Sequence, residues 1–425
     1  MPIEAKRLKS IVGGSAGNLV EWYDWFAYAS LAIYFAPAFF PKGDPTAQLL
    51  STAAIFAVGF LMRPLGAWIM GIYGDRHGRK AGLALSVGLM FAGSLLIAAA
   101  PTYDQVGTIA PVILLVARML QGLSVGGEYG ASATYLSEMA TRDRRGFYSS
   151  FQYVTLIGGQ LIALGVLLLL QALLSEADIE GWAWRIPFLI GALLALAVYL
   201  LRRNLAETAA FAAIDRKTLP TSSARHLFKA HLRPTIMLVM MTAGSSSAFY
   251  AYTTYLQKFL VNTSGFGREA ATQITALALI VFMLAQPLLG LLSDRIGRRP
   301  LLLWFGITGM LITVPVFSAL ATTTDPTMAF LLALVPLLAI APYTAIGAVV
   351  KAELFPAHIR TLGVALPYAL GNAAFGGTAE AVALWFKDQG VEAAFYWYIT
   401  ALIGIATIAF LMVPDTKRTS MIVED

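Results

Sequence analysis

The 425-residue chain contains no cysteine, only four histidines and few charged side chains. The absence of cysteine excludes disulfide bonds, thiol nucleophiles and cysteine-ligated metals, and it leaves the redox compartment open. The histidines, at positions 77, 226, 231 and 358, all fall in predicted loops, without metal-ligand spacing or a neighbouring nucleophile. The sequence also lacks a Gly-x4-Gly-Lys-Ser/Thr phosphate loop. We therefore expect no metal, no cofactor, no ATP hydrolysis and no enzymatic activity.

Charged residues make up 13% of the sequence and hydrophobic residues 58%, a mixture too apolar for a soluble domain to cover its surface. Hydrophobic segments recur along the chain, each about as long as the roughly 20 residues that a membrane-spanning helix needs. Lipid tolerates only helices and closed barrels, and the segments lack the alternation of barrel strands. We predict an all-α integral membrane protein. Its twelve spans are placed at 11–36, 47–71, 81–100, 109–134, 147–172, 185–203, 232–259, 269–292, 300–320, 328–350, 362–386 and 392–412.

An even number of spans puts both termini on one side of the membrane, and the basic residues indicate which side. Most of the 30 Lys and Arg residues fall in loops on the side of the termini. Basic loops stay in the cytoplasm, so we expect both termini to be cytoplasmic in a cell (inner) membrane. Because these bases lie in short loops, the net charge of +6 does not indicate a nucleic-acid partner. The opposite side carries Lys42, Arg185, Lys258, Arg268 and Lys387.

The polar stretch 204–231 contains no predicted span and divides the chain in two. We predict a six-helix bundle over 1–203, a cytoplasmic linker over 204–231 and a second six-helix bundle over 232–425. No further soluble domain is predicted, and we expect a monomer that has the lipid bilayer as its surroundings.

Two loop elements occur twice. Residues 71–80 (Gly-Ile-Tyr-Gly-Asp-Arg-His-Gly-Arg-Lys) reappear as residues 290–299 (Gly-Leu-Leu-Ser-Asp-Arg-Ile-Gly-Arg-Arg). A glutamate followed seven positions later by an arginine also recurs, first as Glu138 and Arg145. The offset is 219 residues between the loop aspartates and 215 between the glutamates. Because the two offsets nearly agree, we infer that a whole half of the chain is duplicated.

These acids and bases at helix ends can pair across the two bundles and separate again, as a gate requires. The alternative is that they are solvated loop charges that only set the topology. The candidate gate residues on the cytoplasmic side are Asp75, Arg76, Arg79, Glu138, Arg145, Asp294, Arg295, Arg298, Glu353 and Arg360. The duplicated loop resembles the best-known motif of the major facilitator superfamily. That resemblance implies two bundles that rock about a central site, with the first, fourth, seventh and tenth helices lining the cavity.

Ionisable residues within spans are costly and point to function. Glu21 and Asp24 lie three residues apart, which places them on one face of the first helix. Two carboxylates that share a dry cavity repel each other, so one should hold a proton near neutral pH, as a proton carrier must. The alternative is that either acid belongs to a fixed network with Arg63 or Arg118.

Arg118 lies about halfway along the fourth span, where its planar guanidinium could bind a carboxylate with two hydrogen bonds. The alternative is a permanent ion pair with Asp24 or Glu21. Arg63 lies nearer the cytoplasmic end, where it can either bind substrate or reach the interface. Glu128 lies among glycines and could relay protons or lock the bundle, whereas Glu380, deep in the eleventh span, is expected to be a structural partner.

Neutral polar residues complete the predicted cavity. Asn18, Gln160, Tyr250 and Tyr343 are the candidates, since amides and phenols can donate hydrogen bonds to carboxylate or keto oxygens. For each tyrosine the alternative is simple aromatic packing.

Four segments carry a closer resemblance: residues 17–24, 59–66, 121–130 and 149–160. Together they are similar to the metabolite:proton symporter family, and within it to permeases for α-ketoglutarate. The resemblance implies proton-coupled uptake of a dicarboxylate, with Arg118, the first-span acids and Gln160 in or near the site. Members of the same family carry shikimate, citrate, or proline and betaine, and these substrates remain alternatives.

Overall fold

The computed structural model describes residues 2–43, 45–202, 207–212 and 222–422. Within them the chain is almost entirely helical and contains no strand. Residues 204–206 and 213–221 of the predicted linker lie outside the described residues, as do the side chains of the first fourteen residues and of Arg268.

Each of the twelve predicted spans has its helix. The first half consists of α1 (Pro2–Phe39), α2 (Pro45–His77), α3 (Arg79–Ala99), α5 (Ile109–Met139), α6 (Arg145–Leu173) and α8 (Arg185–Arg202). In the second half, four spans are single helices: α13 (Arg268–Ile296), α14 (Arg299–Thr322), α15 (Pro326–Glu353) and α18 (Ala393–Met412). The other two spans each consist of three consecutive elements. The first of these is α11 (Leu232–Tyr250), η3 (Ala251–Tyr255) and α12 (Leu256–Asn262), and the second is α16 (Arg360–Gly371), η5 (Asn372–Gly376) and α17 (Ala379–Asp388). Shorter elements connect them: α4 (Tyr103–Val106), η1 (Arg142–Arg144), α7 (Glu176–Asp178), η2 (Ile179–Ala183), α9 (Ala209–Ala212), α10 (Ala224–Ala230) and η4 (Ala357–Ile359).

Nine of the helices are, over their described residues, long and apolar enough to cross a membrane. The other three predicted spans correspond to α1 and to the two helices that η3 and η5 interrupt with a π-helical turn. Such turns concentrate at functional sites. Both lie near the middle of their spans, next to polar residues that line pockets.

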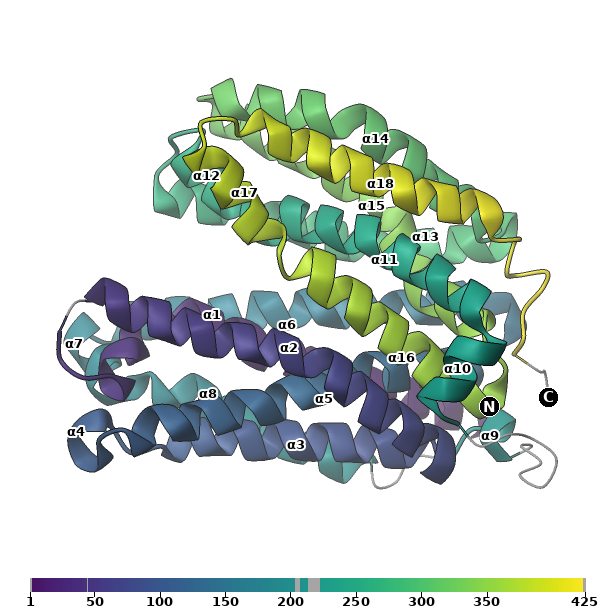
Figure 1. Cartoon of the computed structure of the whole chain (residues 1–425), viewed down its shortest axis with the longest axis horizontal. Coiled ribbons are helices and arrows are strands. Elements are labelled where there is room, and N and C mark those ends of the chain that lie inside the picture. The colour runs from purple at the N-terminus through teal and green to yellow at the C-terminus, as the bar shows by residue number, and fades with distance from the viewer. Residues whose placement is uncertain (1, 44, 203–206, 213–221, 423–425) are drawn as a thin grey trace.

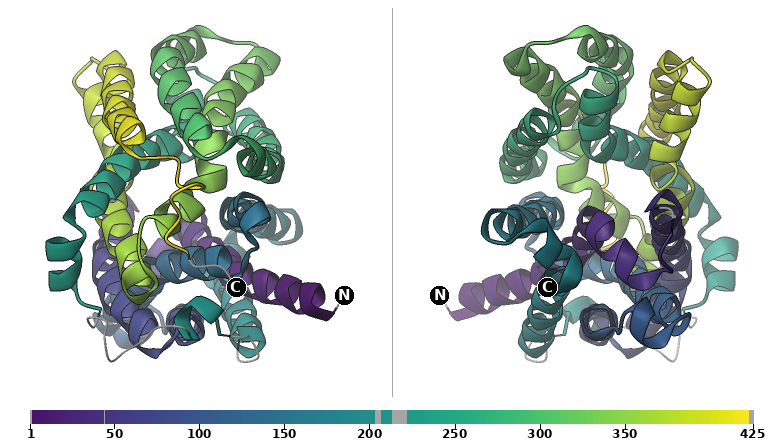
Figure 2. Two further views of the ribbon diagram at one scale, coloured as in Figure 1. Left: turned by 90° about the vertical axis from the view of Figure 1, so that its right-hand side faces the viewer. Right: turned by 90° about the vertical axis from the view of Figure 1, so that its left-hand side faces the viewer.

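The helices form two groups, α1–α8 and α11–α18, which meet toward the end where the N and C labels lie and diverge toward the end of α7 and α12 (Figure 1). Helix α6 packs on α13 and α15, while α2 and α5 pack on α16. Views along the helices show the same two groups end-on, with α10 at the edge of the contact (Figure 2). The duplicated loops, the start of α1 and the end of the described chain all lie at one end, which we call the motif end.

Apolar and polar side chains are distributed as lipid requires rather than as water requires. Large apolar residues such as Leu173, Leu288 and Leu311 are exposed on the outer helix faces, while arginines such as Arg118 and Arg360 are fully buried. Exposed apolar area on this scale marks a surface that meets membrane or partner. The polar interior therefore lies between and within the two helix groups.

Glycines bring α2 and α5 into backbone contact and so fix the position of Arg63. A Cβ atom on Gly126 would lie 2.1 Å from the Arg63 carbonyl oxygen, and one on Gly66 would lie 2.2 Å from that of Leu123. Small residues at helix crossings permit this close approach in membranes.

Replacing Gly126 by leucine should therefore destabilise the fold, because the backbone of α2 cannot yield to a side chain. Overpacking costs roughly 1–3 kcal/mol and more where backbone must move. We expect Gly126→Leu to lower the melting temperature of detergent-purified protein. The matched control is Gly165→Leu in α6, where an added Cβ meets nothing within 4 Å. An unchanged melting temperature in Gly126→Leu would contradict this packing.

Candidate functional site

Asp75 caps the start of a helix in the opposite half. Its carboxylate accepts hydrogen bonds from the peptide N–H groups of Thr361 and Leu362, each 3.1 Å long, in the first turn of α16. Arg79 donates to the same carboxylate at 2.7 Å, as does the Ser222 hydroxyl at 2.9 Å. Free N–H groups at a helix start attract an anion, because the helix dipole is positive there. Asp75 therefore fastens the two halves together at the motif end.

Asp294, the duplicate of Asp75, makes the same contact in the reverse direction. Its carboxylate accepts from the peptide N–H groups of Gly146 and Phe147, at 2.8 and 2.9 Å, in the first turn of α6. Arg298 lies four residues later and donates to it at 2.8 Å. The sequence repeat is thus also a repeat of contacts, in which each half caps a helix of the other.

Glu138 adds an ion pair between the halves. It lies 3.2 Å from the Arg79 guanidinium of its own half and 2.5 Å from that of Arg360 in the other half. In the second repeat, Glu353 lies 3.8 Å from Arg298. The Glu138–Arg360 ion pair joins the two halves, as the sequence suggested for these charges.

The remaining predicted gate residues take less part. Arg145 is buried and its guanidinium donates to the Ser420 hydroxyl at 3.4 Å. Arg76 is exposed and donates to the Ser222 carbonyl oxygen at 3.1 Å, while Arg295 is exposed. The latch, as we use the word below, consists of Asp75, Asp294, Glu138 and their arginines Arg79, Arg298 and Arg360.

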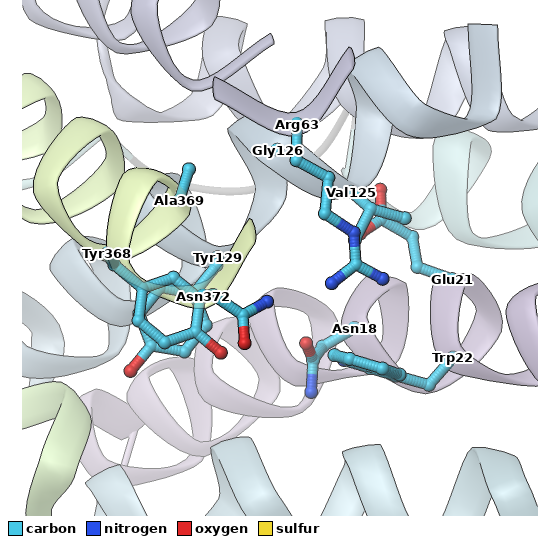
Figure 3. A pocket seen from close by; sticks show the side chains of 10 residues that line it. All are labelled: Asn18, Glu21, Trp22, Arg63, Val125, Gly126, Tyr129, Tyr368, Ala369 and Asn372. Carbon is cyan, nitrogen blue, oxygen red and sulfur yellow. The ribbon is translucent and has the colours of Figure 1, made fainter. Parts of the chain in front are cut away.

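A small pocket with room for about one water molecule lies between the halves, and several polar side chains line it (Figure 3). Helices α1, α2 and α5 of the first half and α16 with η5 of the second half form its walls. Its lining residues are Asn18, Glu21, Trp22, Arg63, Val125, Gly126, Tyr129, Tyr368, Ala369 and Asn372.

Arg63 places an uncompensated cation in this pocket. Its side chain is buried, with the guanidinium carbon 4.0 Å from the Trp25 ring centroid and 4.2 Å from that of Phe60. Nη1 is 3.5 Å from the Tyr250 hydroxyl, and Nε and Nη2 have no hydrogen-bond partner within the described part of the chain. In Figure 3 the guanidinium points into the space that Asn18 and Asn372 also face. A planar cation with free N–H groups is suited to a carboxylate.

Arg118 does not line the pocket, although the sequence favoured it as the central anion receptor. Its guanidinium carbon lies 4.2–4.9 Å from the ring centroids of Tyr28, Trp25 and Phe56, and Nη1 donates to Gln121 at 2.7 Å. The alternative that the sequence left open, an ion pair with Asp24 or Glu21, is not among the described contacts within 4 Å. The rings separate Arg118 from the pocket, because a desolvated cation is stabilised by aromatic faces as well as by anions.

Lys351, like Arg63, is a buried cation with no acid within ion-pair distance among the described residues, and the sequence analysis did not identify it. The predicted span ended at residue 350, but α15 continues to Glu353 and buries the lysine completely. Its ammonium donates to the Tyr129 hydroxyl at 2.6 Å and lies 4.2 Å from the Tyr368 ring centroid. Tyr343, two helical turns earlier on the same face of α15, has its ring centroid 5.7 Å away. The two-turn spacing between Tyr343 and Lys351, which places both on one face of a helix, was the sequence signal that could have identified Lys351.

Tyr129 and Tyr368 separate Lys351 from the pocket. They come from α5 and α16, in different halves, and stack with ring centroids 3.6 Å apart at 13°. Both also line the pocket with Arg63 (Figure 3). Movement of one half against the other must therefore break this stack.

The two first-span acids each have their own serine partners rather than facing each other. Glu21 accepts hydrogen bonds from Ser86, at 2.9 Å, and from Ser124. Asp24 accepts from Ser94 and packs against Gly191 of α8, where an added Cβ would lie 1.9 Å from its Oδ1. Glu21 lines the central pocket, whereas Asp24 lies inside the first bundle.

Glu128 has a full counter-charge. Arg202, near the end of the predicted span 185–203, is buried at the end of α8 and forms a two-pronged ion pair with Glu128, one arm of which is 2.9 Å long. The guanidinium also donates to the Leu83 carbonyl oxygen at 2.7 Å. Glu128 thus ties α5 to α3 and α8 in this conformation.

The other predicted polar residues are divided between two regions. Asn18 lines the central pocket and bonds to Gln152 and Thr155. Tyr343 packs among aromatic rings beside Lys351. Gln160 lines a further pocket toward the opposite end.

Further pockets toward the opposite end lie between the halves, and Glu380 pairs with Lys258 on their walls. The structure is therefore latched at the motif end and hollow toward the other end. Two bundles of membrane-length helices that face each other across a polar pocket define a membrane transporter.

Comparison with known proteins agrees with that class. A family model described as sugar (and other) transporter matches residues 10–225 and 213–423. Its solved relatives include the major facilitator superfamily proton:xylose symporter XylE bound to 6-bromo-6-deoxy-D-glucose, with a TM-score of 0.81, 18% identity and 98% of each chain covered. That likeness shows the twelve-helix major facilitator fold. The chain belongs to the sugar (and other) transporter family.

Two curated relatives are closer in sequence. The α-ketoglutarate permease of Escherichia coli (strain K12) is 51% identical over 407 residues, which cover 96% of this chain and 94% of the relative. The citrate-proton symporter of Klebsiella pneumoniae is 33% identical over 410 residues, covering 95% and 92%.

The latch predicts that Asp294→Asn loosens the motif end. Charge-assisted hydrogen bonds are each worth about 1.5–3 kcal/mol, so losing them should favour opening by about tenfold or more. The absence of cysteine allows a direct measurement by maleimide labelling of Ser149→Cys, because Ser149 is buried between α6 and α15 and accepts from the Val349 N–H at 3.0 Å. We expect faster labelling in the Asp294→Asn background.

Lys229→Cys on the exposed face of α10 is the labelling control, and its rate should not change. Equal labelling of Ser149→Cys in both backgrounds would show that Asp294 does not hold this end closed.

Proposed function

We propose that this protein takes up a small organic anion together with protons by alternating access, and that α-ketoglutarate is its substrate. The observation that carries the proposal is the uncompensated guanidinium of Arg63, buried in a pocket between two bundles. The 51% identity with an α-ketoglutarate permease supports this choice of anion. The fold and the relatives are those of transporters, and we propose no enzymatic activity.

In this proposal the moving bodies are residues 1–203 and 232–425, joined by the linker 204–231. The excess of Lys and Arg on the side of the termini supports a cytoplasmic motif end in an inner membrane. The latch is then the cytoplasmic gate, and the pockets toward the other end face outward. The protein would work as a monomer in the bilayer.

Substrate binding is assigned to Arg63 rather than to Arg118, because aromatic rings cover Arg118. The free Nε and Nη2 of Arg63 would hold one carboxylate, with Tyr250 and Asn372 placed to donate further hydrogen bonds, while Asn18 lines the pocket with its amide already bonded to Gln152 and Thr155. Arg118 would hold the aromatic wall in place behind the site.

Lys351 supplies a second cation for the second carboxylate. A buried ammonium without an acidic partner is expensive in a membrane protein unless function requires it. When the halves separate at the motif end, Tyr129 leaves Tyr368, and the lysine becomes open to the central pocket. A dicarboxylate could then pass from Arg63 toward Lys351 on its way to the cytoplasm.

Proton coupling is assigned to Glu21 and Asp24, which are buried with serine donors and no cation within ion-pair distance in the described structure. A proton on either acid removes a negative charge beside the cationic site, so proton binding and anion binding favour each other. Glu128 would take part only when Arg202 releases it.

Arg63→Ala should weaken α-ketoglutarate uptake into proteoliposomes that carry an inward proton gradient. Losing a two-pronged, charge-assisted contact of about 1.5–3 kcal/mol predicts a rise in KM of roughly 10- to 100-fold. Arg63→Lys keeps the charge but loses the planar fork, so we expect an intermediate KM. Arg233→Ala, an exposed arginine at the start of α11, is the matched control. A wild-type KM in Arg63→Ala would remove Arg63 from the site.

Asp24→Asn should separate substrate movement from the proton gradient. The amide keeps a hydrogen-bonding side chain beside Ser94 but cannot carry a proton. We expect exchange of labelled for unlabelled α-ketoglutarate to continue while gradient-driven accumulation is lost. Glu21→Gln is measured beside it, to tell which acid is required. Full accumulation in both variants would contradict the assignment of the coupling.

The rival substrates are citrate, shikimate and a zwitterion such as proline or betaine. Two cations in the pathway favour a dicarboxylate over a zwitterion. A competition panel of mono-, di- and tricarboxylates, with betaine and shikimate included, distinguishes them. Competition by betaine or shikimate alone would overturn the substrate, and α-ketoglutarate flux without pH dependence would overturn symport.

A further inference from the structure

Three of the four histidines meet at the motif end, outside the latch and the pocket. His226 lies on α10, His231 lies between α10 and α11, and His358 lies on η4 between α15 and α16. Their ring centroids are 5.5–6.3 Å apart, and one nitrogen from each ring lies within 4.8 Å of the other two. No local pattern in the sequence indicates this cluster, because His358 is far from the other two histidines along the chain.

We propose that His226, His231 and His358 form a binding site for a first-row transition metal ion such as Zn²⁺. Imidazole is a preferred ligand of these ions, and three histidines with one open position are a known zinc arrangement. Nitrogens around a tetrahedral zinc at 2.0–2.1 Å lie roughly 3.3 Å apart. The three nitrogens are therefore near that arrangement, and modest rotations of the rings would complete it.

The surroundings suit neutral ligands. All three rings are half-buried, and the Nε2 atom of His358 has no hydrogen-bond partner among the described residues. Burial lowers the pKa of His231 and of His358, and the neighbouring His226 ring lowers both further. His77, the fourth histidine, is not part of the cluster, because its ring stacks on Tyr73 and forms a hydrogen bond with the Tyr73 carbonyl oxygen.

The cluster lies beside the latch. Ser222, four residues before His226, donates its hydroxyl to Asp75 and accepts from Arg76. The carbonyl of Ala357, next to His358, accepts a hydrogen bond from Arg79. A metal ion on the three histidines would fasten α10 to η4, on either side of the contacts that hold Asp75 and Arg79. It would therefore stabilise the latched conformation.

Cobalt titration tests the site without reference to transport. Protein purified with a histidine-free affinity tag is titrated with Co²⁺, and four-coordinate binding is read from its visible absorption bands. We expect one ion per chain, and at least tenfold weaker binding in His226→Ala, His231→Ala and His358→Ala. His77→Ala is the matched control and should bind like wild type. Unchanged binding in the His358 variant, equal loss in the His77 variant, or no binding by wild type would overturn the site.

Thermal unfolding with and without Zn²⁺ distinguishes a variant that has lost the metal site from one that is misfolded. Zinc should raise the melting temperature of wild type and of His77→Ala, and not that of His231→Asn or His358→Asn, which keep a polar side chain of similar reach. A zinc-dependent rise in the two asparagine variants equal to that of wild type would also overturn the site.

The effect on the latch rests on the proposed transport function and is measured separately. Micromolar Zn²⁺ should slow proton-driven uptake by wild type, a chelator should restore it, and His358→Ala should be insensitive. If Co²⁺ binds but Zn²⁺ does not change the rate of uptake, the metal site stands and the proposal that the metal stabilises the latch is rejected. No uptake at all in metal-free conditions would reject the proposed function, while the titration still decides the site.

Discussion

A positive charge buried between two apolar bundles needs an anion or an aromatic face, and this constraint shapes the whole interior. Arg79, Arg298 and Arg360 have carboxylates, Arg202 has Glu128, and Arg118 has rings. Arg63 and Lys351 have aromatic faces but, among the described residues, no acid within ion-pair distance, although Glu21 lines the same pocket as Arg63. The compensated arginines hold helices together, whereas the two uncompensated cations lie at or next to the pocket between the halves. Their missing counter-charge is what an anionic substrate would supply.

Gene duplication explains how the latch can hold the motif end closed and still allow it to open. Asp75 caps a helix of the second half and Asp294 caps a helix of the first, so the closed end is held by two equivalent contacts. Each contact joins a carboxylate to peptide N–H groups and an arginine, and all these groups can be hydrated when they separate. Such hydrogen bonds are strong when water is excluded, and water can replace them when the groups are exposed. They therefore suit an end of the molecule that alternates between a closed and an open state.

Much of the fold follows from the sequence. The twelve spans follow from the length of the hydrophobic segments, and the two halves follow from the repeated loops, because both signals are local. Helix ends were less certain, since a helix that continues beyond the lipid core is no longer hydrophobic. That is why Lys351 fell outside the predicted span 328–350, although α15 continues to Glu353. The rotation of a side chain about its helix is also not encoded locally, so Arg118 was expected to face the pocket that Arg63 faces instead. The histidine cluster depends on contacts between distant segments and had no local signal.

The most direct test of the account is equilibrium binding of α-ketoglutarate and of its uncharged dimethyl ester to the purified protein, measured by titration calorimetry. The two ligands have the same carbon skeleton and differ mainly in charge. If missing counter-charges at Arg63 and Lys351 define the site, the dianion binds, the ester does not compete with it, and Arg63→Ala together with Lys351→Ala abolishes binding. Equal affinity for the ester, or wild-type binding by the double variant, would contradict the account.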